Sequence, residues 1–342
     1  MIATQQPSRR KALGLGGLGI GFGLLWQACG RGPQQTGGAG ERFEGQRWLI
    51  GFSNASERNT WRTALRESIQ KEAARYPIVE LLVTDADESP AKQASDLEDL
   101  LARGAKGLII GAANPFVANA ALKQCNDGGI PTVIVDRMVS TDTYTSFISS
   151  DHGYMARRTL GKLMDLIHGR GKIGLIEGLP GVGPAVDRKA AYDHVLQQYP
   201  QVVAIRQPGD WSRASGLKVT ENILAANPDM VAIHFDGGEM AVGGVQALRA
   251  AGITDDMLRA GRPVLTWMDD YNGGLKLVKQ GIGKFTVQHP PRLHGVMSVR
   301  TLIAALTGQR VPKQQPIEPK DITPANVDQF VALEKPDDFW AS

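Results

Sequence analysis

Charged residues follow an apolar stretch at Gly128–Val139, which reads GGIPTVIVDRMV and ends its β-branched run at Asp136-Arg137. This pattern predicts a buried parallel strand with a carboxylate and a guanidinium at its carboxyl end. In open α/β sheets, ligands bind outside the carboxyl ends of the strands. The acid accepts hydrogen bonds and the arginine donates them, which suits a neutral polar ligand. A surface ion pair that caps the strand explains the same two residues equally well.

Polar or aromatic residues recur at the ends of other predicted strands. The candidates with this placement, together with one arginine near a helix start, are Asn59, Trp61, Arg62, Asp136, Arg137, Arg188, Trp211, Asp236, Asp269 and Gln288. Carboxylates accept from hydroxyl groups, arginine and asparagine donate to them, and indoles such as Trp61, Trp211 and Trp267 can cover the apolar face of a sugar ring. Each residue alone is more typical of a core or capping position. Their recurrence at equivalent places favours a ligand site.

Strands and helices alternate from Arg47 onward. We expect a first series with strands at 48–53, 78–84, 107–111, within 128–139 and at 146–149, and helices at 58–76, from 90 onward and at 116–126. Ser89-Pro90 and Asn114-Pro115 each place a capping residue before proline, which is typical of a helix start. Such βα units predict a parallel sheet with helices on both faces.

A second series follows Asp151, which we expect to cap a helix reaching about residue 168. Its predicted strands are 172–177, 202–207, 230–235, 264–269 and 284–288, and its predicted helices are 184–198, 212–226, 239–251 and 271–280. The helix at 292–306 comes after this sheet is complete, so we expect it to return to the first lobe. Residues 311–342 lack a strong period and are expected to cover the surface. The fold class is therefore α/β, with two doubly wound parallel-sheet lobes.

The N-terminus has the features of an export signal. Arg9, Arg10 and Lys11 precede a short apolar run at 13–25, which is typical of a secretory signal and, with paired arginines, of the twin-arginine route. Ala28-Cys29 is similar to a lipoprotein cleavage site, although Trp26 stands where leucine is usual. We expect residues 1–28 to be removed, Cys29 to be lipidated, and 29–45 to form a flexible tether.

Composition limits the class of protein. The 342 residues, 42% hydrophobic and 21% charged, suit a globular protein with two lobes. Loss of residues 1–28 removes three basic residues and no acid, so the net charge of +3 becomes zero. A neutral mature chain argues against nucleic acid as a partner. If Cys29 is acylated, Cys125 has no partner for a disulfide.

Motifs for other chemistry are absent or broken. Gly178–Gly183 has glycines, but Pro180 interrupts the dinucleotide-binding pattern, and the phosphate-loop, G-x-S-x-G and H-E-x-x-H motifs do not occur. His289 and His294 have no third ligand nearby in sequence, so we predict no metal and no cofactor. A sugar-responsive repressor would need a helix-turn-helix where the export signal stands.

Six segments together resemble the ribose- and galactose-binding proteins, the type I periplasmic sugar-binding components of ATP-driven importers. These segments, in the order of that family, are IGFSNASERNTW, AKQASDLEDLLARGAKGLII, GGIPTVIVDR, DRKAAYDHVL, DWSRASGLKVTENILAANPD and FTVQHP. The resemblance spans about 47–330 and implies a bilobed fold, joined by three inter-lobe strands, that closes on one sugar. We therefore expect an N-terminal lobe of 46–150 plus 289–317, a C-terminal lobe of 151–288 plus 318–330, and a tail at 331–342.

The resemblance also implies roles for individual residues. Asn59 and Trp61 match ligand residues after the first strand, Asp136 and Arg137 match the central pair, and Arg188 matches an arginine of the second lobe. Trp211 stands for a stacking aromatic, Asp269 for an acid, and Gln288 for a hinge glutamine. The Trp61-Arg62 pair is similar to galactofuranose-binding members. One departure is Gly237-Gly238, which replaces Asn-Asp, so Asp236 or Glu239 substitutes for the amide or the ligand has a different shape.

The function expected from these features is solute binding, without catalysis. A sugar or polyol would be captured between the lobes and delivered to a membrane permease of the ABC type. We expect a monomer outside the cytoplasm, held at a membrane only by its lipid anchor. A sugar-modifying enzyme or a ligand-sensing protein on the same bilobed fold is the alternative. The sugar, its ring form and the cognate permease stay open.

Overall fold

The computed structural model describes residues 47–269 and 273–333. The predicted export signal, Cys29 and the tether lie outside the described residues, as does the predicted tail beyond residue 333. None of the helices in the described part of the chain is long and apolar enough to cross a membrane.

The first lobe is built on a six-stranded sheet in which all neighbouring strands are parallel. Its order is β11-β5-β4-β3-β1-β2. The strands are β1 (Trp48–Asn54), β2 (Val79–Asp85), β3 (Gly107–Ile110), β4 (Thr132–Val135), β5 (Ser146–Ser150) and β11 (Gln314–Ile317). Because the strands are parallel, the carboxyl ends of β1 and β4 lie at the same edge of this sheet.

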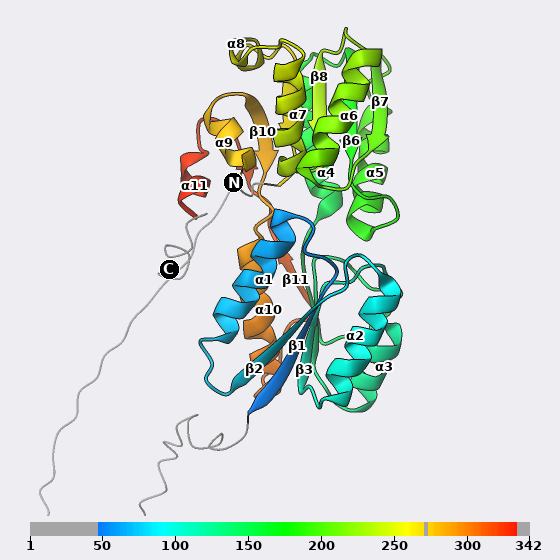
Figure 1. The fold of residues 1–342 in the computed structure, drawn as a ribbon, viewed down its shortest axis with the longest axis vertical. Helices are drawn as coiled ribbons and strands as arrows, with labels where there is room; N and C mark the ends of the chain where they lie inside the picture. Colours follow the sequence, from blue (N-terminus) through cyan, green and yellow to red (C-terminus); the bar gives the residue numbers. More distant parts are fainter. Residues whose placement is uncertain (1–46, 270–272, 334–342) are drawn as a thin grey trace, which may run out of the picture. The chain divides into compact units, whose positions relative to one another are not determined.

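Helices cover both faces of the first sheet (Figure 1). Helices α1 (Thr60–Ala73) and α10 (Pro291–Leu306) pack side by side on one face, and α2 (Pro90–Ala102) and α3 (Asn119–Asp127) pack on the other. Residues of β3 and β4 alternate between these two cores, as the two-residue period of a strand requires. The sheet is therefore a buried central layer, and α10 belongs to the same lobe as α1.

The second lobe repeats this architecture. Its sheet has the order β12-β10-β9-β8-β6-β7, and only β12 runs antiparallel to its neighbour. Its strands are β6 (Gly171–Glu177), β7 (Val202–Pro208), β8 (Ala232–Phe235), β9 (Val264–Trp267), β10 (Gly283–Val287) and β12 (Asp321–Ile322). Its helices are α4 (His152–Leu166), α5 (Gly183–Leu196), α6 (Arg213–Ala226), α7 (Gly238–Ala250), α8 (Asp255–Arg259), α9 (Gly273–Lys279) and α11 (Asp328–Leu333).

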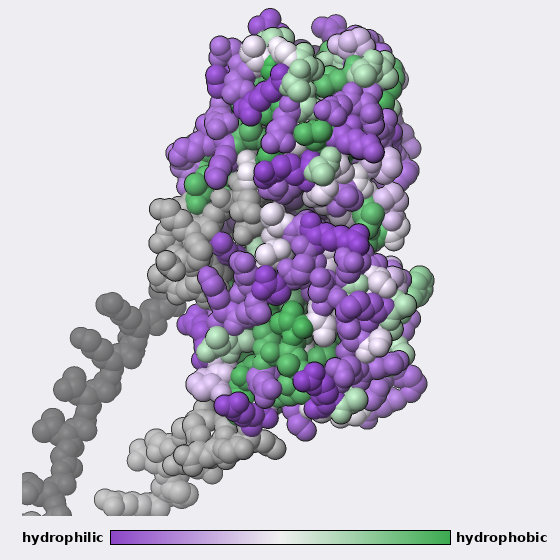
Figure 2. Space-filling model, viewed as in Figure 1, coloured by the Kyte–Doolittle hydropathy of each residue, from purple (hydrophilic) through white to green (hydrophobic). Residues whose placement is uncertain are grey.

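The described chain passes between the two sheets three times: from β5 to α4, from β10 to α10, and from β11 to β12. The fold is therefore two doubly wound α/β lobes joined by three segments, as the sequence predicts. Figure 2 shows that the drawn face of both lobes is mostly hydrophilic, with a hydrophobic patch on the lobe that contains β1 and β2.

Most predicted elements are present, and the capping predictions hold at two helix starts. The side chains of Ser89 and Asp151 accept hydrogen bonds from the third residue beyond them, Lys92 and Tyr154. The helix predicted from residue 116 begins instead at Asn119, because the Asn114 side chain accepts from Phe116 and Val117 and caps a turn.

The sequence pattern missed four short elements. Helix α8 was not predicted, and the region from 311 onward, for which no elements were predicted, contains β11, β12 and α11. These segments have two to six residues, which is too few for a hydrophobic period to emerge.

Helices α6 and α7 pack closely because glycines bring their backbones together. A Cβ atom placed on Gly243 would lie 2.0 Å from the carbonyl oxygen of Arg213. This neighbour is backbone, so the helices would have to separate to admit even a methyl group.

Two histidines are fully buried in the lobes. His234 of β8 lies between the hydroxyl groups of Tyr192 and Thr266, at 2.9 Å from each, and His294 of α10 contacts the carbonyl oxygen of Pro290 through Nδ1 at 2.7 Å. Burial, with the charge of Arg188, lowers the pKa of His234 to about 3. Burial also lowers the pKa of His294 to about 4. Both side chains are therefore neutral at physiological pH.

We predict that Gly243→Ala lowers the free energy of unfolding by about 1–3 kcal/mol through overpacking, despite the better helix propensity of alanine. Gly161 of α4 is the matched control, since nothing lies within 4 Å of an added Cβ. Gly161→Ala should raise stability by about 0.5–1 kcal/mol. Urea unfolding of both variants measures the difference, and equal effects would contradict the close helix contact.

We also predict that the protein loses stability as the pH falls below about 6.5. Below that pH each of His234 and His294 binds a proton in the unfolded chain but not in the folded one, so the unfolded state is favoured. The slope approaches about 1.4 kcal/mol per pH unit for each histidine. Urea unfolding between pH 5 and 8 measures this slope. His294→Leu should reduce it by up to the contribution of one histidine, about 1.4 kcal/mol per pH unit. An unchanged slope in that variant would contradict the assignment.

Candidate functional site

One cavity collects side chains from both lobes. The residues that line it are Asn59, Thr60, Trp61, Arg62, Asp136, Arg137, His152, Pro184, Arg188, Trp211, Glu239, Asp269 and His289. Most of them follow the carboxyl ends of strands in the two sheets, where α/β folds place ligands. Its position between two lobes is one where small-molecule pockets are common.

Eight of the ten predicted site residues line this cavity, and Asp236 and Gln288 do not. Gln288 lies in the segment between β10 and α10, where its backbone N–H donates to the carbonyl oxygen of Lys320. It thus lies in a segment that passes between the lobes, and its role as a hinge glutamine stays a prediction.

Three of the lining residues have backbone conformations that favour glycine. Asp136, Trp211 and Asp269 have φ of 67°, 63° and 63°, and each follows closely after the end of a strand. Such strained conformations persist where the surrounding structure imposes them, often at functional sites. Here they turn the chain sharply at the strand end beside the cavity.

A buried ion pair forms the first-lobe side of the cavity. Arg62 donates to Asp136 Oδ2 at 2.6 Å, and both side chains are almost completely buried. Burial raises the pKa of Asp136, but the Arg62 charge and contacts from His152 and His289 outweigh it and hold that pKa well below its usual range. Burial and the charge of Arg137 lower the pKa of Arg62 to about 10, so the pair stays ionised at neutral pH.

A second ion pair holds Arg137 at the cavity wall. Its guanidinium donates to both carboxylate oxygens of Glu88, at 2.9 and 3.1 Å. This two-point geometry fixes the plane of the guanidinium. The sequence gives no local signal for this contact, because the two residues are 49 positions apart.

On the second lobe, Arg188 is held by Asp236. The guanidinium donates to the carbonyl oxygen of Asp236 at 2.9 Å and lies 3.5 Å from its carboxylate. That carboxylate accepts from Gly178 N at 2.9 Å and from the Tyr192 hydroxyl at 2.6 Å. Burial lowers the pKa of Arg188, but the nearby acidic groups, chiefly Asp236, raise it by more. The pKa is therefore above its ordinary value. Asp236 therefore lies behind Arg188 and supports it.

The three tryptophans considered from the sequence have different surroundings. Trp211 lies at the cavity wall near the guanidinium groups of Arg137 and Arg188, at 5.8 and 6.0 Å from its ring centre. Trp61 stacks on His289 at 4.5 Å and donates its indole N–H to the His289 carbonyl oxygen. The expectation that Trp267 could contact a sugar is wrong, because this residue is fully buried in the core of the second lobe.

The Gly237-Gly238 pair makes room for neighbouring site residues. A Cβ on Gly237 would lie 3.2 Å from the Trp211 ring, and one on Gly238 would lie 2.8 Å from Asp269 Oδ1. Gly238 N also donates to that oxygen at 2.9 Å. Of the two suggested substitutes for the missing amide, Glu239 lines the cavity, with its Oε2 bound by Arg213 at 2.9 and 3.1 Å.

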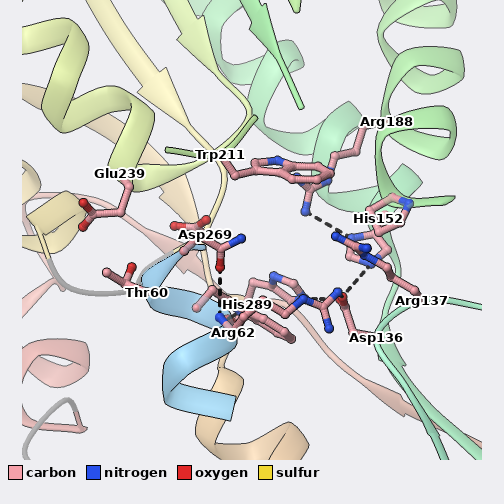
Figure 3. A pocket seen from close by; sticks show the side chains of 13 residues that line it. Thr60, Arg62, Asp136, Arg137, His152, Arg188, Trp211, Glu239, Asp269 and His289 are labelled. Carbon is pink, nitrogen blue, oxygen red and sulfur yellow. Dashed lines mark hydrogen bonds and ion pairs between the residues drawn. The ribbon is translucent and has the colours of Figure 1, made fainter. Parts of the chain in front are cut away.

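Two histidines at the cavity were not among the predicted site residues. His152 is the first residue of α4, and His289 lies between β10 and α10. Figure 3 shows them gathered with Arg62 around Asp136, while Glu239 lies at the other side of the pocket. Both histidines come from segments that pass between the lobes. That placement depends on the three-dimensional crossing of the chain, which the sequence pattern does not reveal.

Asp136, His152 and His289 also have the composition of a metal site, with ligand atoms within 4.8 Å of one another. Electrostatics disfavour a divalent cation there, because Arg62 contacts Asp136 at 2.6 Å and Arg188 contacts His152 Nδ1 at 3.2 Å. The guanidinium can only donate, so Nδ1 accepts and the proton of the neutral ring resides on Nε2. A metal ligand would need that nitrogen free of its proton.

Several polar atoms at the cavity have no hydrogen-bond partner within the described residues. They are Arg62 Nη1, Asp136 Oδ1, Arg137 Nε, His152 Nε2, Arg188 Nε, Trp211 Nε1 and Glu239 Oε1. Buried polar groups without partners are rare in folded proteins and call for an explanation. A ligand with several hydroxyl groups would supply both donors and acceptors to this set.

Comparison with known proteins agrees with this geometry. Residues 50–310 match the family model of the periplasmic binding protein domain. The ribose import binding protein of Bacillus subtilis is 27% identical over 290 residues, which are 85% of this chain and 92% of that protein. The galactofuranose-binding protein of Escherichia coli is 26% identical over 72% of this chain and 78% of its own length.

A solved structure has the same fold. The binding protein of the arabinose ABC transporter from Shewanella sp. ANA-3, bound to α- and β-L-arabinofuranose, superposes with a TM-score of 0.76 and 26% identity. The match covers 84% of this chain and 96% of that one. With the family model spanning most of its length, the chain belongs to the periplasmic binding protein family and is a binding protein, not an enzyme.

Proposed function

We propose that this periplasmic binding protein captures one neutral monosaccharide or related polyol in the cavity and delivers it to an ABC-type permease. The observation that carries the proposal is a set of donors and acceptors, without partners in the described part of the chain, around a cavity that has an indole on its wall. The known ligands of the relatives, which include ribose, galactofuranose and arabinofuranose, support this class of compound.

The charge balance of the site supports an uncharged ligand. Each of the three arginines at the cavity already contacts an acid: Arg62 with Asp136, Arg137 with Glu88, and Arg188 with Asp236. Asp269 and Glu239 add negative charge. An anionic ligand would therefore find these three arginines already paired, and its desolvation would not be offset.

Binding of a ligand by groups from both lobes would favour the closed arrangement. Asp136 and Arg62 belong to the first lobe, and Arg188 and Trp211 to the second. A ligand that bonds to both sets stabilises the conformation in which they face one another. The closed form is then the one that the permease recognises.

The remaining features of the proposal come from the sequence. We propose twin-arginine export, a lipid anchor on Cys29, a monomer, and lobes bounded at 46–150 plus 289–317 and 151–288 plus 318–330. The polar ligand site, which suits a solute of the extracytoplasmic space, is compatible with this route. Mass spectrometry of the membrane-bound protein would test the anchor by finding acyl chains on Cys29, and an unmodified Cys29 would contradict it.

We predict that Trp211→Ala weakens sugar binding about 5- to 30-fold, because loss of the ring removes about 1–2 kcal/mol of stacking. Trp211→Phe should keep most of the affinity. Calorimetry with D-ribose, L-arabinose, D-galactose and myo-inositol first identifies the sugar that the parent binds. Equal affinity of the parent and Trp211→Ala would contradict the role of the ring.

We further predict that anionic derivatives bind at least about 100-fold more weakly than the neutral sugars, because an unpaired carboxylate or phosphate would be desolvated beside Asp269 and Glu239. Matched pairs for calorimetry are D-galactose with D-galacturonate and D-ribose with ribose 5-phosphate. Tighter binding of either anion would show that an arginine exchanges its acid for the ligand, and would overturn the neutral class.

A further inference from the structure

We propose that Asp136, His152 and His289 form a seat for one hydroxyl group of the ligand, and that this seat determines which sugar the protein selects. The inference rests on the proposed function, since it assumes a ligand with hydroxyl groups. It goes beyond that function by assigning a binding role to two histidines that the sequence did not mark.

The three polar atoms converge on one point at the cavity wall. Asp136 Oδ1 lies 3.3 Å from His152 Nε2 and 3.2 Å from His289 Nε2. All three atoms lie within 4.8 Å of one another, so a single oxygen can lie about 2.8 Å from each of them. The three side chains are more than nine-tenths buried, and all three residues line the cavity.

Asp136 Oδ1 and His152 Nε2 do not satisfy each other. Although they are 3.3 Å apart, neither has a hydrogen-bond partner of good geometry in the part of the chain that the structure describes. An oxygen between them would supply what each lacks. The unsatisfied pair therefore points to a bound group at this position.

The protonation of the seat matches a hydroxyl group. The contact of Arg188 with His152 Nδ1 places the proton of that ring on Nε2, which makes Nε2 a donor. Arg62 holds Asp136 as a carboxylate, which can only accept. A hydroxyl group is both donor and acceptor, so it can accept from His152 and donate to Asp136. An ether oxygen or a hydrogen at the same position could not make both bonds.

Neighbouring contacts hold the seat rigid before the ligand arrives. The second oxygen of Asp136 is bound by Arg62, and the Ser149 hydroxyl donates to the Asp136 carbonyl oxygen at 2.9 Å. His289 is fixed by the stacked ring of Trp61 and by the bond from its indole N–H. A preorganised polar site loses little entropy on binding and rejects ligands that leave its groups unpaired.

The seat also lies where the chain passes between the lobes. Asp136 follows β4 of the first sheet, His152 begins the helix after the first crossing, and His289 lies in the second crossing. One hydroxyl group bound there contacts the first lobe and residues at two of the three crossings. It thus offers polar contacts in a site where Gly237-Gly238 stands in place of the Asn-Asp that the resemblance implies.

The test compares sugars that differ by a single hydroxyl group. Calorimetry on the full-length protein first finds the tightest ligand among D-ribose, L-arabinose, D-galactose and myo-inositol, and then measures its monodeoxy analogues. We expect one analogue to lose at least about 1,000-fold in affinity, because it leaves Asp136 Oδ1 and His152 Nε2 without the hydroxyl group that bonds to both. The affinity for the sugar itself should be about 10- to 100-fold lower in His152→Leu than in the parent protein. The affinity for that deoxy analogue should fall little further when His152 is replaced.

Two further variants separate a binding role from a structural one. His152→Gln keeps an N–H donor and should retain most of the affinity and the discrimination. His194→Leu, on the exposed face of α5, is the matched control and should bind as the parent does. Melting temperatures of all variants show which of them are folded.

Three outcomes would overturn the seat. The first is that every deoxy analogue loses the same factor in His152→Leu as in the parent. The second is that the parent binds one equivalent of zinc that His152→Leu does not, while the sugar affinities of the two proteins are equal. The third is that the parent binds none of the sugars, which would refute the proposed function itself and the seat with it.

Discussion

The site depends on the buried ion pair between Asp136 and Arg62, which needs neighbouring groups to offset the cost of its burial. Taking Asp136 and Arg62 out of water costs several kcal/mol for each ion, which their mutual attraction offsets only when further hydrogen bonds satisfy the remaining atoms. Here Arg62 remains charged despite its burial, and the two histidines lie near the Asp136 oxygen that Arg62 leaves for a ligand. Removal of one partner would leave a buried charge uncompensated and cost about 3–5 kcal/mol. Asp136 is therefore both a ligand group and a structural one.

The parallel topology explains how distant residues reach this pair. Since all neighbouring strands of the first sheet run parallel, the ends of β1 and β4 meet at one edge, and α1 carries Arg62 back to Asp136 from 74 positions earlier. In the second lobe, Gly178, Gly237 and Gly238 provide the space that Trp211 and Asp269 occupy. Small residues at strand ends are thus as necessary for the cavity as the polar residues that line it.

The sequence predicts the parts of the site that follow from strand ends, and misses those that follow from packing. Asp136, Trp211 and Asp269 could be found because the carboxyl ends of parallel strands share one edge. The supporting role of Asp236 could not, since it depends on Tyr192, 44 positions away. His152 and His289 could not either, because a histidine beside a helix start carries no periodic signal. Trp267 was misjudged because a strand-end indole can turn toward the core or the cavity.

Selectivity in such a site must come from hydrogen-bond geometry more than from charge. With its arginines each in contact with an acid, the cavity offers a ligand little net Coulomb attraction, so the gain on binding is the satisfaction of donors and acceptors that are otherwise unpaired. A missing or inverted hydroxyl group leaves such an atom buried without a partner, which costs more than a simple lost contact. The neutral pairing of the arginines thus makes the position of each hydroxyl group decisive.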